Sequence, residues 1–381
     1  MSLPLEGIRV LDFTRILSGP FCTMRLGDMG AEVIKIEQPE GGDDSRKWGP
    51  PFINGESAYF LSVNRNKKSI TLDLKTKEAK EIIHKLIIRT DVLVENFRAG
   101  VMQKMGFGYE EMKKINQKIV YCSISGYGQT SSKSHQPSFD LVVQGESGLM
   151  EATGIPDGAP TKVGISLADV TAGTLAFEGI LLALFHSEKT GEGQMVDISL
   201  LDGLLSLFTY QSQIALMTGK KIQRRGNEHP TISPYETYQT KDGYINVAIG
   251  TETHWKNFCN AIQRTDLLVD TCFAVNAKRV ENRAVLLAAL QPIFCGKTNN
   301  EWLELLLRAD VPAGKIQSLN EALNSEVVKE RAMVIEIVHP KIGTMKTVCN
   351  PIKLSAIGST TCSPAPLLGE HTEEILKEIE K

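Results

Sequence analysis

The stretch IRVLDFTRILSGPFCTMRLGDMGAEVIKIE, residues 8–37, decides the fold class that this chain should adopt. Its first part, IRVLDF, is a strand-like apolar run, and its last part, AEVIKIE, is a second one. A helix is predicted between them, over Pro20 to Met29. A strand, a helix and a strand in this order build parallel sheets whose faces are covered by helices. The stretch therefore predicts an α/β fold.

The same alternation continues toward residue 130, with strands SITLDL, DVLVENF and KIVYCSIS and with helices over 78–88 and 102–115. In such a sheet, ligands bind past the carboxyl ends of the strands, so functional residues are expected in the loops. These loops are TRILSGP and QPEGGDDSRKWGPP after the first two strands, SVNRNKKS before the third, and ENFRAG and SGYGQT after the fourth and fifth.

A polar hinge, TGKKIQRRGNEHP, breaks this pattern at residues 218–230. Short strands (YETYQT, GYINVAI) and three helices follow it, and the segment 333–355 then has the pattern of antiparallel strands. GEHTEEILKEIEK is predicted as a closing helix. We expect a large Rossmann-like α/β domain from residues 1–217 and 326–381, and a smaller α+β domain from residues 218–325.

The composition narrows the function classes. The 381 residues are 42% hydrophobic and carry a net charge of -3, which gives no reason to expect nucleic acid or a membrane surface as partner. No apolar run is expected to approach the ~20 residues that span a bilayer. The start, MSLPLEGIRVLDF, enters a strand without a basic, cleavable leader, so a cytoplasmic location is expected. The seven cysteines form no CxxC or Cys/His cluster, which predicts reduced thiols and no metal site.

Asp169 stands at the head of the most apolar run in the chain, VGISLADVTAGTLAFEGILLALF, residues 163–185. A stripe of small residues along this run predicts a helix packed closely against a neighbour. SLAD fits a capping box, with Ser166 as N-cap and Asp169 at N3. Local sequence thus allows two roles for Asp169, a structural cap or a reactive carboxylate.

Basic residues gather in NRNKKS, and Arg98 in ENFRAG would lie on the same rim of the sheet. Such a cluster is either a solvated face or a site for a polyphosphate ligand. The first loop lacks GxGxxG, which argues against a dinucleotide. A diphosphate ligand without that fingerprint suggests coenzyme A.

These loops resemble the class III CoA-transferases of the formyl-CoA transferase/CaiB-BaiF type over essentially the whole chain. The matching segments are GIRVLDFTRILSGPF, LGDMGAEVIKIEQPEGGDDSR, WGPPF, SVNRNKKSI, VLVENFRAG, MGFGYE, SISGYGQT, GISLADVTAG, KTGEGQ and PLLGEHTEEIL. The branch it resembles most is that of the succinyl-CoA:glutarate CoA-transferases.

The resemblance implies that Asp169 is the catalytic nucleophile, which attacks an acyl-CoA thioester and passes through an anhydride and an enzyme–CoA thioester. It implies coenzyme A and acyl-CoA as substrates, a small (di)carboxylate as acceptor, no permanently bound cofactor, and ring-like chains in an interlocked homodimer. It also implies CoA contacts by Arg15, Ile16, Leu17, Lys35, Arg65, Lys68, Asn96, Phe97 and Arg98. A glycine-rich shielding loop found in some branches is absent, and RGNEHPTISPYE stands in that region.

An acceptor dicarboxylate would require a cation, ideally an arginine, for its distal group. The candidates for this pocket are Arg46, Tyr127, Phe139, Arg224 and His229. Two alternatives remain. A 2-methylacyl-CoA racemase of the same superfamily would need a histidine where this chain has Phe139, within PSFDLVVQ. A non-catalytic CoA-binding protein would leave Asp169 with a purely structural role.

Overall fold

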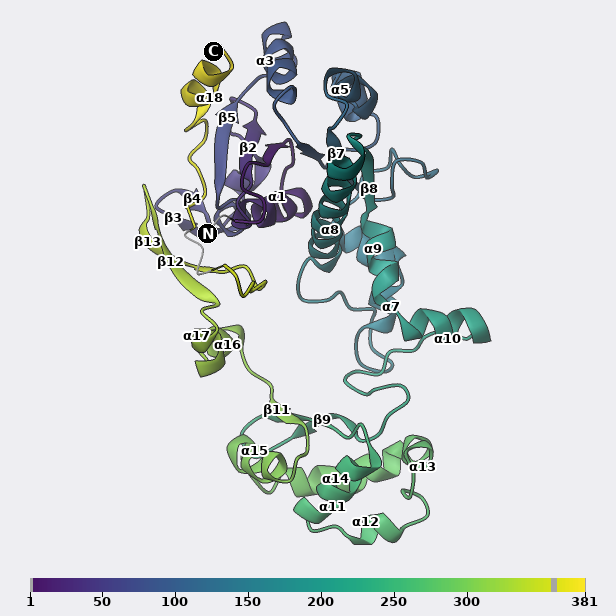
Figure 1. Cartoon of the computed structure of the whole chain (residues 1–381). Coiled ribbons are helices and arrows are strands. Elements are labelled where there is room, and N and C mark those ends of the chain that lie inside the picture. The colour runs from purple at the N-terminus through teal and green to yellow at the C-terminus, as the bar shows by residue number, and fades with distance from the viewer. Residues whose placement is uncertain (1–2, 358–361, 381) are drawn as a thin grey trace. The chain divides into compact units, whose positions relative to one another are not determined.

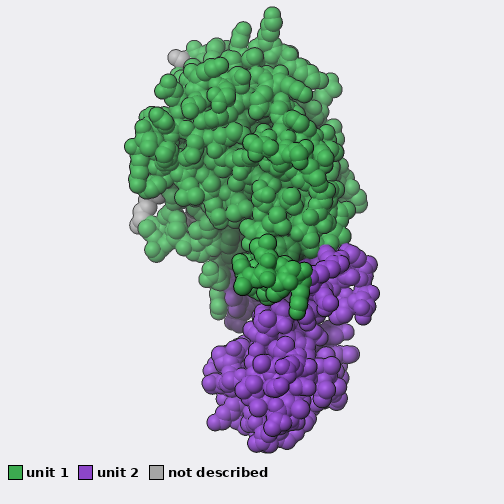
Figure 2. Space-filling view, turned by 90° about the vertical axis from the view of Figure 1, so that its right-hand side faces the viewer, with its two compact units in different colours: residues 1–150, 162–220, 329–381 green, residues 151–161, 221–328 purple. Residues whose placement is uncertain are grey.

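A computed structural model describes residues 3–357 and 362–380. The chain divides into two compact units, which Figure 2 colours separately. Unit 1 comprises residues 1–150, 162–220 and 329–381, and unit 2 comprises residues 151–161 and 221–328. The predicted boundaries after residues 217 and 325 fall three residues before the observed ones, and no local pattern of residues indicates that 151–161 goes with the smaller unit. Residues 1–2, 358–361 and 381 of the predicted large domain lie outside the described residues.

The centre of unit 1 is a six-stranded sheet in the order β5-β2-β1-β6-β7-β8 (Figure 1). Every neighbouring pair in it is parallel, as the alternation of strands and helices predicts. Its strands are β1 (Arg9–Asp12), β2 (Glu32–Glu37), β5 (Lys67–Thr71), β6 (Val92–Glu95), β7 (Val120–Ser125) and β8 (Met195–Ser199).

Helices cover both faces of this sheet and bury two apolar clusters. One cluster lies under α1 (Ser18–Asp28) and α8 (Leu167–Thr190), and the other lies under α3 (Lys77–Ile87), α5 (Tyr109–Ile115) and α18 (Thr372–Ile379). Because both faces are covered, most residues of β2, β6 and β7 are buried on both sides of the sheet. The short helix α4 (Val101–Met105) follows β6.

The long helix α8 packs against α1, as the stripe of small residues predicts. An ideal Cβ on Gly173 would lie 2.4 Å from the carbonyl oxygen of Ser18, so only glycine permits this approach. The most apolar 18-residue window of α8 has a mean hydropathy of 1.6, which makes this helix, alone in the described chain, long and apolar enough to cross a membrane. That corrects the expectation that no run approaches such a length. Its contacts with α1, β7 and β8 are those of a core helix.

Further elements of unit 1 surround the ends of the sheet. They are η1 (Asp44–Lys47), β3 (Phe52–Ile53), β4 (Glu56–Ser57), α2 (Ala58–Val63), α6 (Asp140–Glu146), α7 (Leu149–Ala152), α9 (Leu200–Leu207), α10 (Tyr210–Thr218), β12 (Val334–His339) and β13 (Gly343–Val348). The single helix predicted over 201–217 is instead broken into α9 and α10, because Thr209 has φ 43. β12 and β13 form the predicted antiparallel pair.

Unit 2 is a small α+β unit. Its three-stranded antiparallel sheet has the order β11-β10-β9, with β9 (Tyr235–Gln239), β10 (Tyr244–Ala248) and β11 (Ala313–Lys315). Its helices are α11 (Glu252–Ala261), α12 (Asp266–Val269), α13 (Asn276–Glu281), α14 (Arg283–Phe294), α15 (Asn299–Arg308) and α16 (Leu319–Leu323), with α17 (Glu326–Glu330) at its end. Aromatic residues of these elements, including Trp255, Phe294 and Trp302, form its core.

Candidate active site

Asp169 is the third residue of α8 and lies beside the first turn of α1. Burial raises the pKa of its carboxyl group to about 7, and the negative charge of Asp140 adds to this increase, while a hydrogen bond with the Ser18 side chain opposes it. A carboxyl group with such a pKa exchanges its proton near neutral pH, which is typical of functional sites.

The helix cap does not come from the residues that the sequence suggests. Ser166 occupies the N-cap position, but its side chain makes no capping hydrogen bond, so the predicted capping box is wrong. The carboxylate of Asp140, from α6, accepts the backbone N–H of Ala168 at 2.9 Å instead, and Gln144 donates to its other oxygen at 2.8 Å. Asp169 is therefore not needed to cap α8, and its carboxyl group is available to react with a ligand.

Tyr59 is a second residue that the sequence analysis missed. Burial and the charges of Asp169, Asp43 and Asp140 raise the pKa of its phenol to about 12. The phenol therefore keeps its proton at neutral pH and can donate a hydrogen bond near the Asp169 carboxyl group. The ring of Trp48 contacts Tyr59 edge-on, with centroids 5.1 Å apart. No local pattern singles out Tyr59 or Asp140, because their importance comes from contacts between distant segments.

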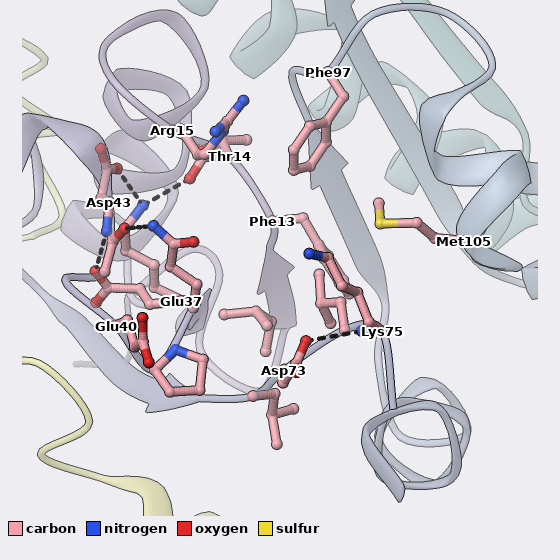
Figure 3. Close-up of a pocket in the computed structure, with 17 residues that line it drawn as sticks. Phe13, Thr14, Arg15, Glu37, Glu40, Asp43, Asp73, Lys75, Phe97 and Met105 are labelled. Atoms are coloured by element: carbon pink, nitrogen blue, oxygen red, sulfur yellow. Dashed lines mark hydrogen bonds and ion pairs between the residues drawn. The ribbon is translucent and has the colours of Figure 1, made fainter. Parts of the chain in front are cut away.

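A cavity of about 610 Å³ opens past the carboxyl ends of β1, β2, β5 and β6 (Figure 3). The general rule for parallel sheets predicts a ligand site at this edge. Its lining residues are Phe13, Thr14, Arg15, Lys35, Ile36, Glu37, Gln38, Pro39, Glu40, Gly42, Asp43, Leu72, Asp73, Leu74, Lys75, Phe97 and Met105.

Three of the predicted CoA contacts line this cavity: Arg15, Lys35 and Phe97. The guanidinium of Arg15 lies 4.9 Å from the centre of the Phe97 ring. Lys35 is fully buried and forms an ion pair with Asp43 at 2.9 Å, so its charge is already balanced within the protein.

The loop after β5 contributes Asp73, Leu74 and Lys75 to the cavity, and the sequence analysis missed these residues. The basic loop NRNKKS precedes this strand, whereas ligands bind past the carboxyl ends of strands, in the loop that follows. Lys75, in the loop after β5, is thus a basic residue that lines the cavity, whereas the cations of NRNKKS do not line it.

The other predicted CoA residues are placed differently. Arg65 pairs with Asp28 at 2.6 Å, and Lys68 pairs with both Glu32 and Glu374, so these two cations belong to ion pairs that hold the fold together. Neither lines the cavity.

Ile16, Leu17, Asn96 and Arg98 lie in the loops beside the cavity without lining it. The side-chain amide of Asn96 accepts a hydrogen bond from the backbone N–H of Arg15 at 2.8 Å and donates one to the carbonyl oxygen of Arg15 at 2.7 Å.

The residues proposed for the acceptor pocket are spread over both units. The guanidinium of Arg46 makes a bidentate pair with Glu37, with two contacts of 2.7 Å, and stacks on Phe60. The charge of Arg46 is therefore already paired with a carboxylate within the protein. Arg224 lies in unit 2 and pairs with Glu151 at 3.0 Å.

His229, also in unit 2, contacts the ring of Tyr235 with centroids 5.1 Å apart. In unit 1, Phe139 is exposed and precedes Asp140, the cap of α8. Tyr127 is buried, and Lys133 lies 5.4 Å from its ring centre. Of the predicted pocket residues, Phe139 is the one that neighbours Asp140 in the sequence.

The comparison with known proteins agrees with this fold. The model of CoA-transferase family III matches residues 5–372. Succinyl-CoA:glutarate CoA-transferase from Mus musculus is 40% identical over 99% of this chain and 86% of its own length. Acetyl-CoA:oxalate CoA-transferase from Acetobacter aceti is 40% identical over 98% of this chain and 95% of its own. The crystal structure of a CAIB/BAIF family protein from Brucella suis superposes with a TM-score of 0.88, at 37% identity and with full coverage of both chains.

The chain belongs to CoA-transferase family III, and it is an enzyme of that class.

Proposed function

We propose that this enzyme moves CoA from a donor such as succinyl-CoA to a small dicarboxylate such as glutarate, with Asp169 as the nucleophile. The observation that carries this proposal is the Asp169 carboxyl group, which is partly buried and released from capping because Asp140 caps α8. The relatives named above support the substrate class, because their names specify acyl-CoA donors and dicarboxylate acceptors.

The proposed cavity for the CoA nucleotide is joined to Asp169 by a short segment. Thr14 and Arg15 line the cavity, and Ser18, three residues further along the chain, bonds to the Asp169 carboxyl group. A CoA molecule with its nucleotide in the cavity would extend its thioester along this segment toward Asp169.

The reaction follows from covalent catalysis by a carboxylate. An oxygen of Asp169 bonds to the thioester carbon, the carbon–sulfur bond breaks, and the CoA thiolate leaves with its electron pair. The thiolate then attacks the aspartyl carbonyl carbon of the anhydride, which releases the donor acid and forms an Asp169–CoA thioester. The acceptor carboxylate attacks this thioester, and the reverse sequence yields the new acyl-CoA. The free energy of the thioester is conserved only if water is excluded.

Mass spectrometry of the trapped enzyme tests this proposal. Incubation with succinyl-CoA followed by hydroxylamine should convert Asp169 to a hydroxamate, and Asp169→Asn should lower turnover by on the order of a thousandfold or more. Asp202→Asn is a matched control, because Asp202 is the third residue of α9 as Asp169 is of α8. It should retain normal turnover. A wild-type enzyme without an adduct, or an active Asp169→Asn variant, would refute the nucleophile.

We also propose that the enzyme acts in the cytoplasm as an interlocked homodimer. Large apolar side chains are exposed on two helices of unit 1, notably Leu182 and Phe185 on α8 and Leu216 and Met217 on α10. Monomeric proteins rarely expose such residues in groups, and a second copy would cover them. The seven cysteines are free thiols, which suits a reducing compartment.

A further inference from the structure

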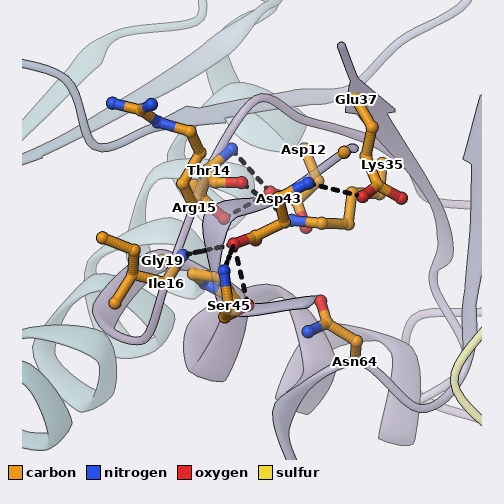
Figure 4. Close-up of polar contacts among 12 residues, drawn as sticks. Asp12, Thr14, Arg15, Ile16, Gly19, Lys35, Glu37, Asp43, Ser45 and Asn64 are labelled. Carbon is orange, nitrogen blue, oxygen red and sulfur yellow. Dashed lines mark hydrogen bonds and ion pairs between the residues drawn. The ribbon is translucent and has the colours of Figure 1, made fainter. Parts of the chain in front are cut away.

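The loop between β1 and α1 has an unfavourable backbone conformation at Ile16. This residue has φ 70, in the left-handed region that a β-branched side chain rarely adopts. Such a conformation persists only where the surrounding structure imposes it, and it is found most often at functional sites. The backbone N–H of Ile16 donates to the carboxylate of Asp43, at 3.1 and 3.2 Å from its two oxygens (Figure 4).

Asp43 is itself fixed from several sides. Its carboxylate is fully buried, forms an ion pair with Lys35 at 2.9 Å, and accepts the backbone N–H and the hydroxyl of Ser45 at 2.9 and 2.8 Å. Despite burial, these partners hold its pKa well below the usual range, so Asp43 remains a carboxylate. Lys35 also donates to the carbonyl oxygen of Thr14 at 2.8 Å. The pair therefore holds the loop at two points, Thr14 and Ile16.

Between these points, Asn96 holds Arg15 by both its backbone N–H and its carbonyl oxygen. The amide of Asn96 also lies 3.4 Å from the hydroxyl of Ser18, which bonds to Asp169. Thr14 and Arg15 of the loop thus line the cavity, and Ser18 at the end of the loop bonds to Asp169. A shift of the loop would change the CoA site and the surroundings of Asp169 together.

We propose that Asp43, paired with Lys35, is a positioning residue for this CoA-transferase: it imposes the left-handed conformation of Ile16 and so keeps the CoA cavity aligned with Asp169. This inference rests on the proposed function, because it takes the cavity to be the CoA site. It also changes the expected role of Lys35, from a direct CoA contact to a residue that acts through Asp43 and the loop. A buried ion pair alone is weak evidence for added stability. The positioning role therefore rests on the hydrogen bonds that Asp43 and Lys35 make with the loop backbone.

The test is a double-mutant cycle that measures CoA binding by calorimetry. Asp43→Asn removes the charge that holds the N–H of Ile16, and it should weaken the binding of free CoA by about tenfold, the value of one charge-assisted hydrogen bond. Glycine adopts positive φ without strain. In the Ile16→Gly background, adding Asp43→Asn should therefore weaken the binding of free CoA by only about threefold or less. A purely structural role for Asp43 would not depend on the residue at position 16.

Asp28→Asn is the matched control, because it breaks another buried ion pair. Asp28 is the last residue of α1 and pairs with Arg65. It should lower the melting temperature and leave CoA affinity unchanged. Asp43→Asn leaves Lys35 buried without its partner. If it does not fold, the double variant Lys35→Met/Asp43→Asn removes both charges and should show the same loss of CoA affinity.

The outcomes separate the two proposals. CoA affinity within twofold of wild type in folded Asp43→Asn, or in the double variant, would overturn the positioning role. An equal loss in the Ile16 and Ile16→Gly backgrounds would also overturn it. Wild-type enzyme that binds no CoA, or that transfers none, would instead overturn the proposed function.

Discussion

At the scale of single residues, the carboxyl group of Asp169 has surroundings that oppose its ionisation. Burial and the charge of Asp140 raise the pKa of Asp169 to about 7, although the positive end of the α8 dipole favours the anion. The folded protein therefore binds a proton that the unfolded chain has already lost between pH 4 and 7. This residue costs stability as the pH rises through that window, and the cost reaches its full value above the folded pKa. The burial of Asp169 is thus maintained at the expense of stability.

We predict that kcat/KM rises with pH as Asp169 ionises. Below about pH 7 the rate should increase nearly tenfold per pH unit, and above it the rate should level off, because only the carboxylate attacks. A pH–rate profile between pH 5 and 9 measures this. Asp140→Asn removes the neighbouring charge while keeping an oxygen for the helix cap, so it should move the midpoint to lower pH. A flat profile across pH 5 to 8 would contradict the assignment.

At the scale of elements, the contact between α1 and α8 places Asp169 beside Ser18. Gly173 permits this contact, and it lies one helical turn beyond Asp169 on α8. The sequence predicted that α8 packs closely against a neighbour, but it did not identify α1 as that neighbour.

Gly173→Ala should therefore separate α8 from α1. The new methyl group would meet the backbone oxygen of Ser18, which cannot move aside as a flexible side chain could. We expect the free energy of unfolding to fall by about 1–3 kcal/mol, with a loss of transferase activity in the folded fraction. Urea unfolding and steady-state assays measure the two effects.

Gly145→Ala is the matched control within helix α6, where the nearest heavy atom to the new methyl group is 3.7 Å away. It should leave activity intact and stability unchanged or slightly higher, because alanine favours helices. If Gly173→Ala behaved in the same way, the α1–α8 contact would not position the nucleophile.

At the scale of the whole molecule, the proposed interlocking of two chains would have a kinetic consequence. The wild-type enzyme should have twice the 41.9 kDa mass of one chain in light scattering, even after strong dilution. Two differently tagged preparations should exchange no subunits in native buffer, because linked chains must unfold to separate, and they should exchange after unfolding and refolding together. A monomeric mass, or rapid exchange under native conditions, would contradict an interlocked dimer.

The sequence predicted the fold more completely than the site. Alternating strands and helices follow from local periodicity, and the parallel sheet confirms them. The break at Thr209 was missed because no glycine or proline stands between Gly203 and Gly219 to mark it. Asp140, Tyr59 and the loop after β5 were missed because each reaches the site from a distant segment. Arg46 looked free in the sequence only because its partner, Glu37, lies on another element.

By itself, the sequence determined the layered α/β architecture and the position of Asp169 at the start of an apolar helix, since periodicity and helix-start signals act over a few residues. Only the tertiary structure decided which carboxylate caps that helix, which cations line the cavity at the sheet edge, and what holds Ile16 in its conformation. Those outcomes depend on which buried charged groups from distant segments lie close to one another in the folded chain. The energy of such pairs is set by distance and burial, which no local pattern of residues contains.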